Sequence, residues 1–118
     1  MRYFITISSI TLLLSLLGCE NFEEVVPLAD LEVYVTGTFS GNPRENISVT
    51  LFLTKEDAED EINAISNTQK TNIDGITIFY ELDGNRRYWV RAAPFLTRTI
   101  RETSSLREGL NSFSISVL

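Results

Sequence analysis

The sequence contains no histidine and a single cysteine. Without histidine, the chain cannot form a Ser-His-Asp triad or a Cys-His nucleophile pair, and it has no side chain whose ordinary pKa lies between about 5 and 8. One thiol cannot supply the nitrogen and sulfur ligands of a zinc site. We therefore expect no cofactor and no metal centre of this kind. The 118 residues allow one small domain.

The N-terminal segment has the pattern of a secretory signal. Arg2 precedes an apolar run over residues 4–17, which ends at Gly18 and Cys19. The run is shorter than the roughly 20 apolar residues that a membrane-spanning helix needs. The alternative is an uncleaved helical anchor. We predict that residues 1–18 are a signal peptide.

The residues Leu16-Leu17-Gly18-Cys19 resemble the lipobox of bacterial lipoproteins, in which the cysteine is lipidated and becomes the mature N-terminus. The resemblance implies that Cys19 carries a lipid anchor, such as palmitate, whose several chains hold the protein on a membrane. The alternative is a free thiol after a cleaved or buried helix. Residues 19–30 form an acidic tether. It resembles the export signals that place some Gram-negative lipoproteins on the outer face of the outer membrane, which implies surface exposure.

Apolar and polar residues alternate in several short stretches separated by Gly, Asn and Asp turns, which predicts β-strands. The stretches are residues 31–39, 47–54, 76–82, 88–93, 97–103 and 110–118, with a further polar strand near 68–72. Thr54 is a candidate cap for a short helix or loop over residues 55–65. The pattern predicts one antiparallel β-sandwich of about seven strands over residues 31–118.

Residues 49–54, 70–79, Leu82 and 88–92 together resemble the transthyretin-like (prealbumin-like) sandwich, an Ig-like Greek key. They are similar in particular to the carboxypeptidase-regulatory-like and Cna-B-like modules of bacterial surface proteins. The resemblance gives Gly75 the positive φ of a tight turn, and it makes Leu82 and Tyr88 close one end of the sandwich, with the tyrosine hydroxyl bonded to backbone. Related hydrolases use histidines that this chain lacks, so we expect no enzyme.

Four aromatic residues lie opposite or next to the expected core positions. They are candidates for a solvent-facing surface that stacks on sugars or peptides. The alternative is that both faces of the central strands are covered and these residues fill the core. The candidates are Trp89, Tyr80, Phe52 and Tyr34.

Charge is uneven along the chain. Residues 19–83 contain fourteen acidic and three basic residues, whereas residues 84–118 contain six arginines and two acidic residues. The overall acidity argues against a nucleic-acid partner. Five of these arginines either form a patch for an anionic ligand or pair with acidic neighbours across strands. They are Arg86, Arg87, Arg91, Arg98 and Arg101.

Five carboxylates fall within residues 56–61 and are candidates for calcium binding. The sequence lacks the Asp-x-Asp-x-Asp-Gly loop with a closing glutamate. A solvated acidic helix or loop is therefore the favoured interpretation.

The sequence favours a non-enzymatic, lipid-anchored envelope protein whose sandwich presents a binding or accessory surface to a protein or glycan partner. The first alternative is a fimbrial or pilus-like subunit, because some lipoprotein pilins share the transthyretin-like fold. Such pilins are cut after a basic residue, and none lies between Cys19 and Pro43. The second alternative is a small hydrolase that uses a pair of carboxylates in a cleft.

Overall fold

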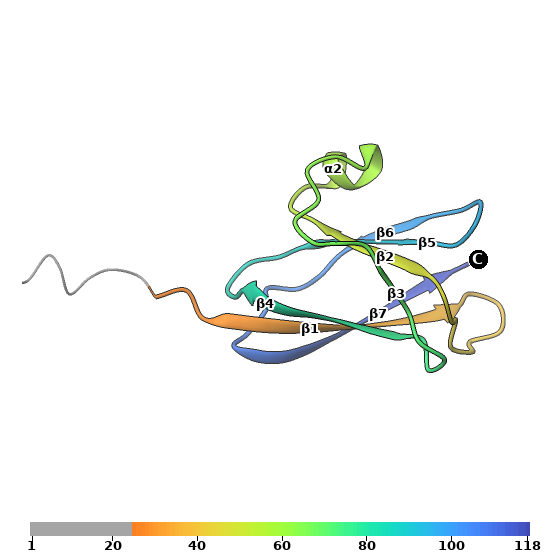
Figure 1. The fold of residues 1–118 in the computed structure, drawn as a ribbon, viewed down its shortest axis with the longest axis horizontal. Helices are drawn as coiled ribbons and strands as arrows, with labels where there is room; N and C mark the ends of the chain where they lie inside the picture. The colour runs from red at the N-terminus through yellow and green to blue at the C-terminus, as the bar shows by residue number, and fades with distance from the viewer. Residues whose placement is uncertain (1–24) are drawn as a thin grey trace, which may run out of the picture.

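The computed structural model describes residues 25–118, which form two facing β-sheets and one short helix (Figure 1). The three-stranded sheet contains β1 (Leu28–Gly37), β4 (Ile76–Asp83) and β7 (Gly109–Val117). The four-stranded sheet contains β2 (Ser48–Phe52), β3 (Gln69–Lys70), β5 (Trp89–Ala93) and β6 (Thr99–Glu102), and the helix is α2 (Lys55–Asp60). The predicted all-β sandwich of about seven strands is confirmed.

β1 is the central strand of its sheet, with β4 on one side and β7 on the other. β1 and β4 are antiparallel, whereas β1 and β7 are parallel, with Ala29 opposite Gly109 and Gly37 opposite Val117. The pairs of the four-stranded sheet are all antiparallel. The expectation of a wholly antiparallel sandwich is therefore wrong for one pair. Parallel partners need a long connection, and here the chain between them supplies it by forming strands of the opposite sheet.

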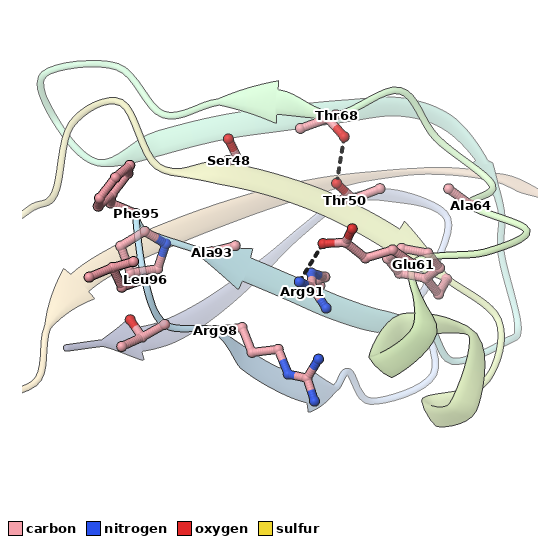
Figure 2. Close-up of a pocket in the computed structure, with 13 residues that line it drawn as sticks. Ser48, Thr50, Glu61, Ala64, Thr68, Arg91, Ala93, Phe95, Leu96 and Arg98 are labelled. Atoms are coloured by element: carbon pink, nitrogen blue, oxygen red, sulfur yellow. Dashed lines mark hydrogen bonds and ion pairs between the residues drawn. The ribbon is translucent and has the colours of Figure 1, made fainter.

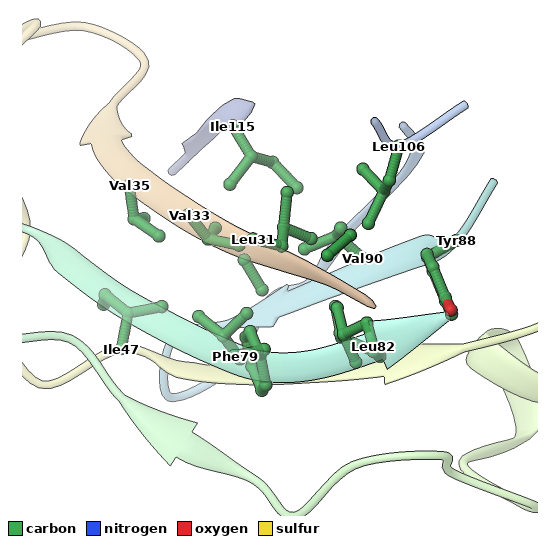
Figure 3. Packing of buried hydrophobic residues seen from close by; sticks show 14 of the residues in the cluster. Leu31, Val33, Val35, Ile47, Phe79, Leu82, Tyr88, Val90, Leu106 and Ile115 are labelled. Atoms are coloured by element: carbon green, nitrogen blue, oxygen red, sulfur yellow. The ribbon is translucent and has the colours of Figure 1, made fainter. Parts of the chain in front are cut away.

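The alternating side chains of β1 explain its position in the sheet. Leu31, Val33 and Val35 are fully buried between the sheets, while Glu32 and Tyr34 are half-buried on the opposite face. Branched side chains pack well on a pleated surface with one covered face. The core also contains residues of the facing sheet, of β4 and β7, and of the connections between strands (Figure 3), among them Ile47, Val49, Leu51, Phe79, Leu82, Tyr88, Val90, Leu106 and Ile115.

The limits of β1 differ from those predicted. The strand begins at Leu28, so residues 28–30 belong to the sheet and not to the tether, and Ala29 is buried. It ends at Gly37, because the chain turns there and the Gly41 N–H donates to the Gly37 carbonyl at 2.9 Å. Phe39, which alternation assigns to the core side, is consequently 91% exposed.

β2 is buried on both faces over part of its length. Val49 and Leu51 point into the core, and Phe52, on the opposite face, is only 2% exposed. α2 lies over this outer face of the four-stranded sheet (Figure 1). The helix begins at the predicted cap, where the Thr54 hydroxyl accepts a hydrogen bond of 3.1 Å from the Asp57 N–H. The predicted short helix is confirmed.

Gly75 forms the tight turn between β3 and β4. Its φ is +77°, in the left-handed region that favours glycine. The turn packs directly on β1: the Val35 N–H donates to the Gly75 carbonyl at 2.7 Å, and a Cβ on Gly75 would lie 2.6 Å from the Val35 carbonyl oxygen. The predicted role of Gly75 as a positive-φ turn residue is confirmed.

Leu82 and Tyr88 close one end of the sandwich, as predicted. Both side chains are buried, and in Figure 3 the tyrosine hydroxyl lies at the end of the core beside Leu82. The hydroxyl donates a hydrogen bond of 2.7 Å to the Asp83 carbonyl. The Tyr88 N–H donates to the Thr103 hydroxyl at 3.1 Å. The bond to Thr103 joins the β4–β5 connection to the β6–β7 connection.

Candidate functional site

An open groove of about 930 Å³ lies on the outer face of the four-stranded sheet (Figure 2). Its floor is formed by outward-facing residues of β2 and β5, where Ser48 lies opposite Ala93 and Thr50 opposite Arg91. These side chains face outward because their neighbours Val49, Val90 and Ala92 are buried in the core. The alternation of side chains along β2 and β5 therefore determines which residues form the floor of the groove.

Arg91 holds in place the wall of the groove that lies at the C-terminal end of α2. Its guanidinium donates to the Ala58 carbonyl at 2.9 Å and pairs with the Glu61 carboxylate (Figure 2). The Arg91 side chain is only 12% exposed. Arg98 donates to the Glu59 carbonyl at 3.0 Å. Because the last carbonyls of a helix lack intrahelical partners, the two arginines satisfy the C-terminal end of α2 and hold it against the sheet.

The opposite wall is the tip of the β5–β6 hairpin. Phe95 and Leu96 line the groove and are 96% and 86% exposed. Hydroxyl groups lie across from them, with the Thr50 and Thr68 side chains hydrogen-bonded at 2.8 Å. The groove thus combines exposed apolar side chains with hydroxyls, an arrangement typical of ligand-binding clefts.

Glu61 is the carboxylate that lines this groove within the described chain, and Arg91 already pairs with it. A glycosidase-type mechanism needs two carboxylates at a set separation in one cleft. The groove therefore does not bring together the acid and base of that mechanism.

The structure separates the four aromatic candidates onto two surfaces. Tyr34 and Tyr80 lie on the three-stranded sheet, Tyr34 half-buried beside Ile76 and Tyr80 66% exposed. Phe52 and Trp89 are opposite each other on the four-stranded sheet. Phe52 is buried beneath the segment that contains α2, so for this residue the alternative that both faces of the strand are covered is the correct one. Trp89 is half-buried next to it.

Phe95 and Leu96, rather than these four residues, form the exposed apolar wall of the groove. The sequence holds one indication of this: two large apolar residues follow Pro94, where the strand ends. A turn with exposed apolar residues is a candidate contact surface. Periodicity did not identify them because they lie outside any strand.

The arginines mostly pair with acidic groups. Arg87 lies 3.5 Å from Glu102, and Arg86 lies 4.0 Å from Asp83. Arg101 lies over the ring of Phe113 at 6.0 Å. Together with the contacts of Arg91 and Arg98, these pairs favour a structural role over an anion-binding patch.

The acidic segment of α2 is also locally paired. Lys55 lies 3.9 Å from Glu59, and the first-turn carboxylates Glu56 and Asp57 lie at the end of the helix where negative charge is favoured. Within residues 25–118, no three Cys, Asp or Glu side chains are close enough to hold a metal ion.

Cys19 and the predicted signal peptide lie outside the described residues. In the part of the chain that the structure does describe, no helix has the length and apolar character needed to cross a membrane.

Comparisons with known proteins bear on the fold alone. No family matches the sequence, and no curated protein matches it. Among solved structures, the chain is similar to the Bacillus anthracis TIE protein, with a TM-score of 0.56 and 12% identity over 76% of this chain. The chain covers 16% of that protein. At this identity, the likeness supports the β-sandwich architecture and carries no functional assignment.

Proposed function

We propose that this chain is a non-enzymatic, lipid-anchored envelope protein of a Gram-negative bacterium. Cys19 attaches it to the outer membrane, and its sandwich, of the transthyretin-like type, presents the groove to a protein or glycan partner. The proposal combines the lipobox-like sequence around Cys19 with the groove on the four-stranded sheet.

The groove is the observation that carries the binding function. Its apolar wall of Phe95 and Leu96 supplies surface for stacking on a sugar ring or an apolar side chain. The hydroxyls of Ser48, Thr50 and Thr68 supply donors and acceptors that orient a ligand. Apolar surface together with polar groups that fix the orientation of a ligand is typical of binding sites.

The position of the groove suits an anchored protein. The described chain enters β1 at the end of the sandwich that also holds the β4–β5 connection, whereas the tip of the β5–β6 hairpin lies at the opposite end (Figure 1). An anchor that precedes β1 therefore leaves the Phe95–Leu96 wall directed away from the point of attachment.

Ligand titration monitored by tryptophan fluorescence tests the proposal, because Trp89 is the only tryptophan and lies beside the groove-lining Phe52. The purified protein is screened against panels of glycans and peptides. We expect a ligand that changes the Trp89 emission, and we expect the combined substitution Phe95→Ala and Leu96→Ala to weaken its binding at least about tenfold, since two large apolar contacts are lost.

Phe39→Ala is the matched control, because Phe39 is an equally exposed loop aromatic that does not line the groove. It should leave binding unchanged. Equal losses in both variants, or binding that survives the groove substitution, would show that the groove is not the binding site.

A further inference from the structure

Three of the four sheet edges are protected against pairing with another strand. β3 is only two residues long. β6 is four residues long and carries the charged residues Arg101 and Glu102. β4 is irregular at Glu81, whose φ is +57°, and its pairing register with β1 shifts between Ala29 and Leu31. Short, charged or bulged edges are the features by which soluble proteins prevent edge-to-edge association.

The fourth edge, β7, has none of these features. It is nine residues long, Gly109–Val117, and contains no charged residue and no proline. Its register with β1 is continuous along the whole strand. Its outward-facing side chains are mostly small hydroxyls, from Ser112, Ser114 and Ser116, and all three are exposed. β7 is thus a long, regular and uncharged edge.

The backbone of β7 is available at this edge. The Thr38 N–H donates to the Val117 carbonyl at 2.7 Å, so the backbone groups of Val117 point toward β1. Since alternate residues of a paired strand point to opposite sides, the N–H and C=O groups of Ser112, Ser114 and Ser116 point away from β1. Within residues 25–118, no other strand pairs with this side of β7.

We propose that β7 pairs with β7 of a second copy of this chain, antiparallel and around a twofold axis. When the residues whose backbone groups point away from β1 overlap fully, Leu110 lies opposite Ser116 of the other copy and Ser112 lies opposite Ser114. A row of backbone donors and acceptors at the spacing of a strand is matched only by another extended polypeptide. The pairing joins two three-stranded sheets into one continuous sheet.

The charges at the two ends of β7 favour a second copy as the occupant. Glu108 precedes the strand, and Arg44 lies at its other end, where its guanidinium donates to the Leu118 carbonyl at 3.1 Å. Antiparallel pairing brings Glu108 of each copy to the end that holds Arg44 of the other. The strand between them is uncharged, so no like charges lie opposite each other along the paired strands themselves. Because a twofold interface uses the same surface on both copies, the assembly closes as a dimer and does not extend into a filament.

Disulfide trapping in the native envelope tests the proposal. Ser112→Cys and Ser114→Cys, introduced together in the full chain, should give a dimer on a non-reducing gel that disappears on reduction, because opposite residues of paired strands lie within disulfide reach. The parent chain, whose one cysteine is Cys19, and a variant with Ser40→Cys and Ser105→Cys at exposed loop sites are the controls. Both should stay monomeric on the gel.

A charge substitution provides the second test. Ser112→Lys with Ser114→Lys places like charges opposite each other across the interface, and we expect the dissociation constant of the dimer, measured by sedimentation of the detergent-extracted full chain, to rise on the order of tenfold. Thr36→Lys adds one lysine on the same sheet face but on the central strand, and it should leave the dimer intact. Circular dichroism confirms that each variant is folded.

Monomeric wild-type protein, a dimer that persists in the double-lysine variant, or trapping of the cysteine variant only to a different protein would each overturn the proposal. These outcomes are independent of the groove, since β7 belongs to the other sheet.

Discussion

The hydroxyl of Tyr88 donates a hydrogen bond of 2.7 Å to the backbone carbonyl of Asp83. The bond spans the connection from β4 to β5, while the ring of Tyr88 is buried in the core. One side chain thus fills the end of the sandwich and fixes the path of the chain that leaves it. The arrangement can be tested by two quantities: the free energy of unfolding and its dependence on pH.

Tyr88→Phe should lower the free energy of unfolding by about 1 kcal/mol, because the ring still packs but the Asp83 carbonyl loses its partner. For a domain of this size, the melting temperature should fall by roughly 4–8 °C. Thermal and chemical denaturation measure both. Tyr80→Phe is the control, since Tyr80 is largely exposed. Equal effects of the two substitutions would contradict the role assigned to the Tyr88 bond.

Stability should also fall at alkaline pH in a way that depends on Tyr88. Burial raises the pKa of Tyr88 above its model-compound value of 10.0, the negative charge of Asp83 adds to this increase, and Arg86 and the backbone hydrogen bond oppose it. The folded state therefore holds the phenolic proton more tightly than the unfolded state. This contribution is complete below pH 10 and is lost as the pH rises through the folded pKa. Unfolding curves of Tyr88→Phe should show a smaller alkaline decrease than those of the parent; identical decreases would refute the assignment.

Arg91→Gln should loosen the wall of the groove that contains α2. It removes the bond to the Ala58 carbonyl and the ion pair with Glu61, and we expect a loss of roughly 1–2 kcal/mol in the free energy of unfolding. Amide exchange of residues 56–62 should accelerate by more than that of the sheets. Arg87→Gln, which breaks an exposed pair with Glu102, should cost less than about 0.5 kcal/mol. Unchanged exchange in Arg91→Gln would mean that the helix is held by other contacts.

A comparison of Gly75→Ala with Gly41→Ala separates two contributions to the loss of stability: the strain of a positive φ and the steric overlap of an added Cβ. Both glycines have positive φ, +77° and +69°, but only at Gly75 would a Cβ meet nearby atoms. We expect Gly41→Ala to cost about 1 kcal/mol and Gly75→Ala about 2–4 kcal/mol, because the latter also displaces the backbone of β1. Denaturation of the two variants under the same conditions provides the comparison. Similar losses would show that the contact with Val35 is easily relieved.

Cys19→Ala should abolish membrane association. The lipid that the sequence predicts at this thiol is the expected attachment, and alanine cannot accept it. Cell fractionation and metabolic labelling with a radioactive fatty acid measure the result. Cys19→Ala protein that still fractionates with the membranes, or that still incorporates the fatty acid, would disprove the anchor.

The sequence predicted the strands well where one face is buried and the other is not. In β1, the alternation through Leu31, Val33 and Val35 matches the observed burial, and the turn at Gly75 and the cap at Thr54 also lie where expected. The sequence left open whether Phe52 is exposed or buried, and the structure shows it buried because α2 covers the second face of β2. A strand that is covered on both sides shows no alternation that would reveal it.

The pairing of β1 with β7 and the groove were beyond the reach of the sequence pattern. Periodicity reports which face of a strand is buried, and it carries no information about the neighbouring strand or its direction. The groove depends on contacts between distant residues, such as Arg91 with Ala58 and Glu61. Such contacts form only once the sheet has placed the segments together.

The central position of β1 has a consequence for the order of folding. Its parallel partner β7 is reached only at the far end of the described chain, with Thr36 and Ser116 separated by 80 positions. Pairings at such separation slow folding, because the entropy of closing the loop is lost before the contacts form. If the predicted signal peptide leads the chain through the membrane, β1 is exported before β7, its parallel partner. The three-stranded sheet can then be completed only after β7 has been exported. The chain therefore remains incompletely folded during translocation.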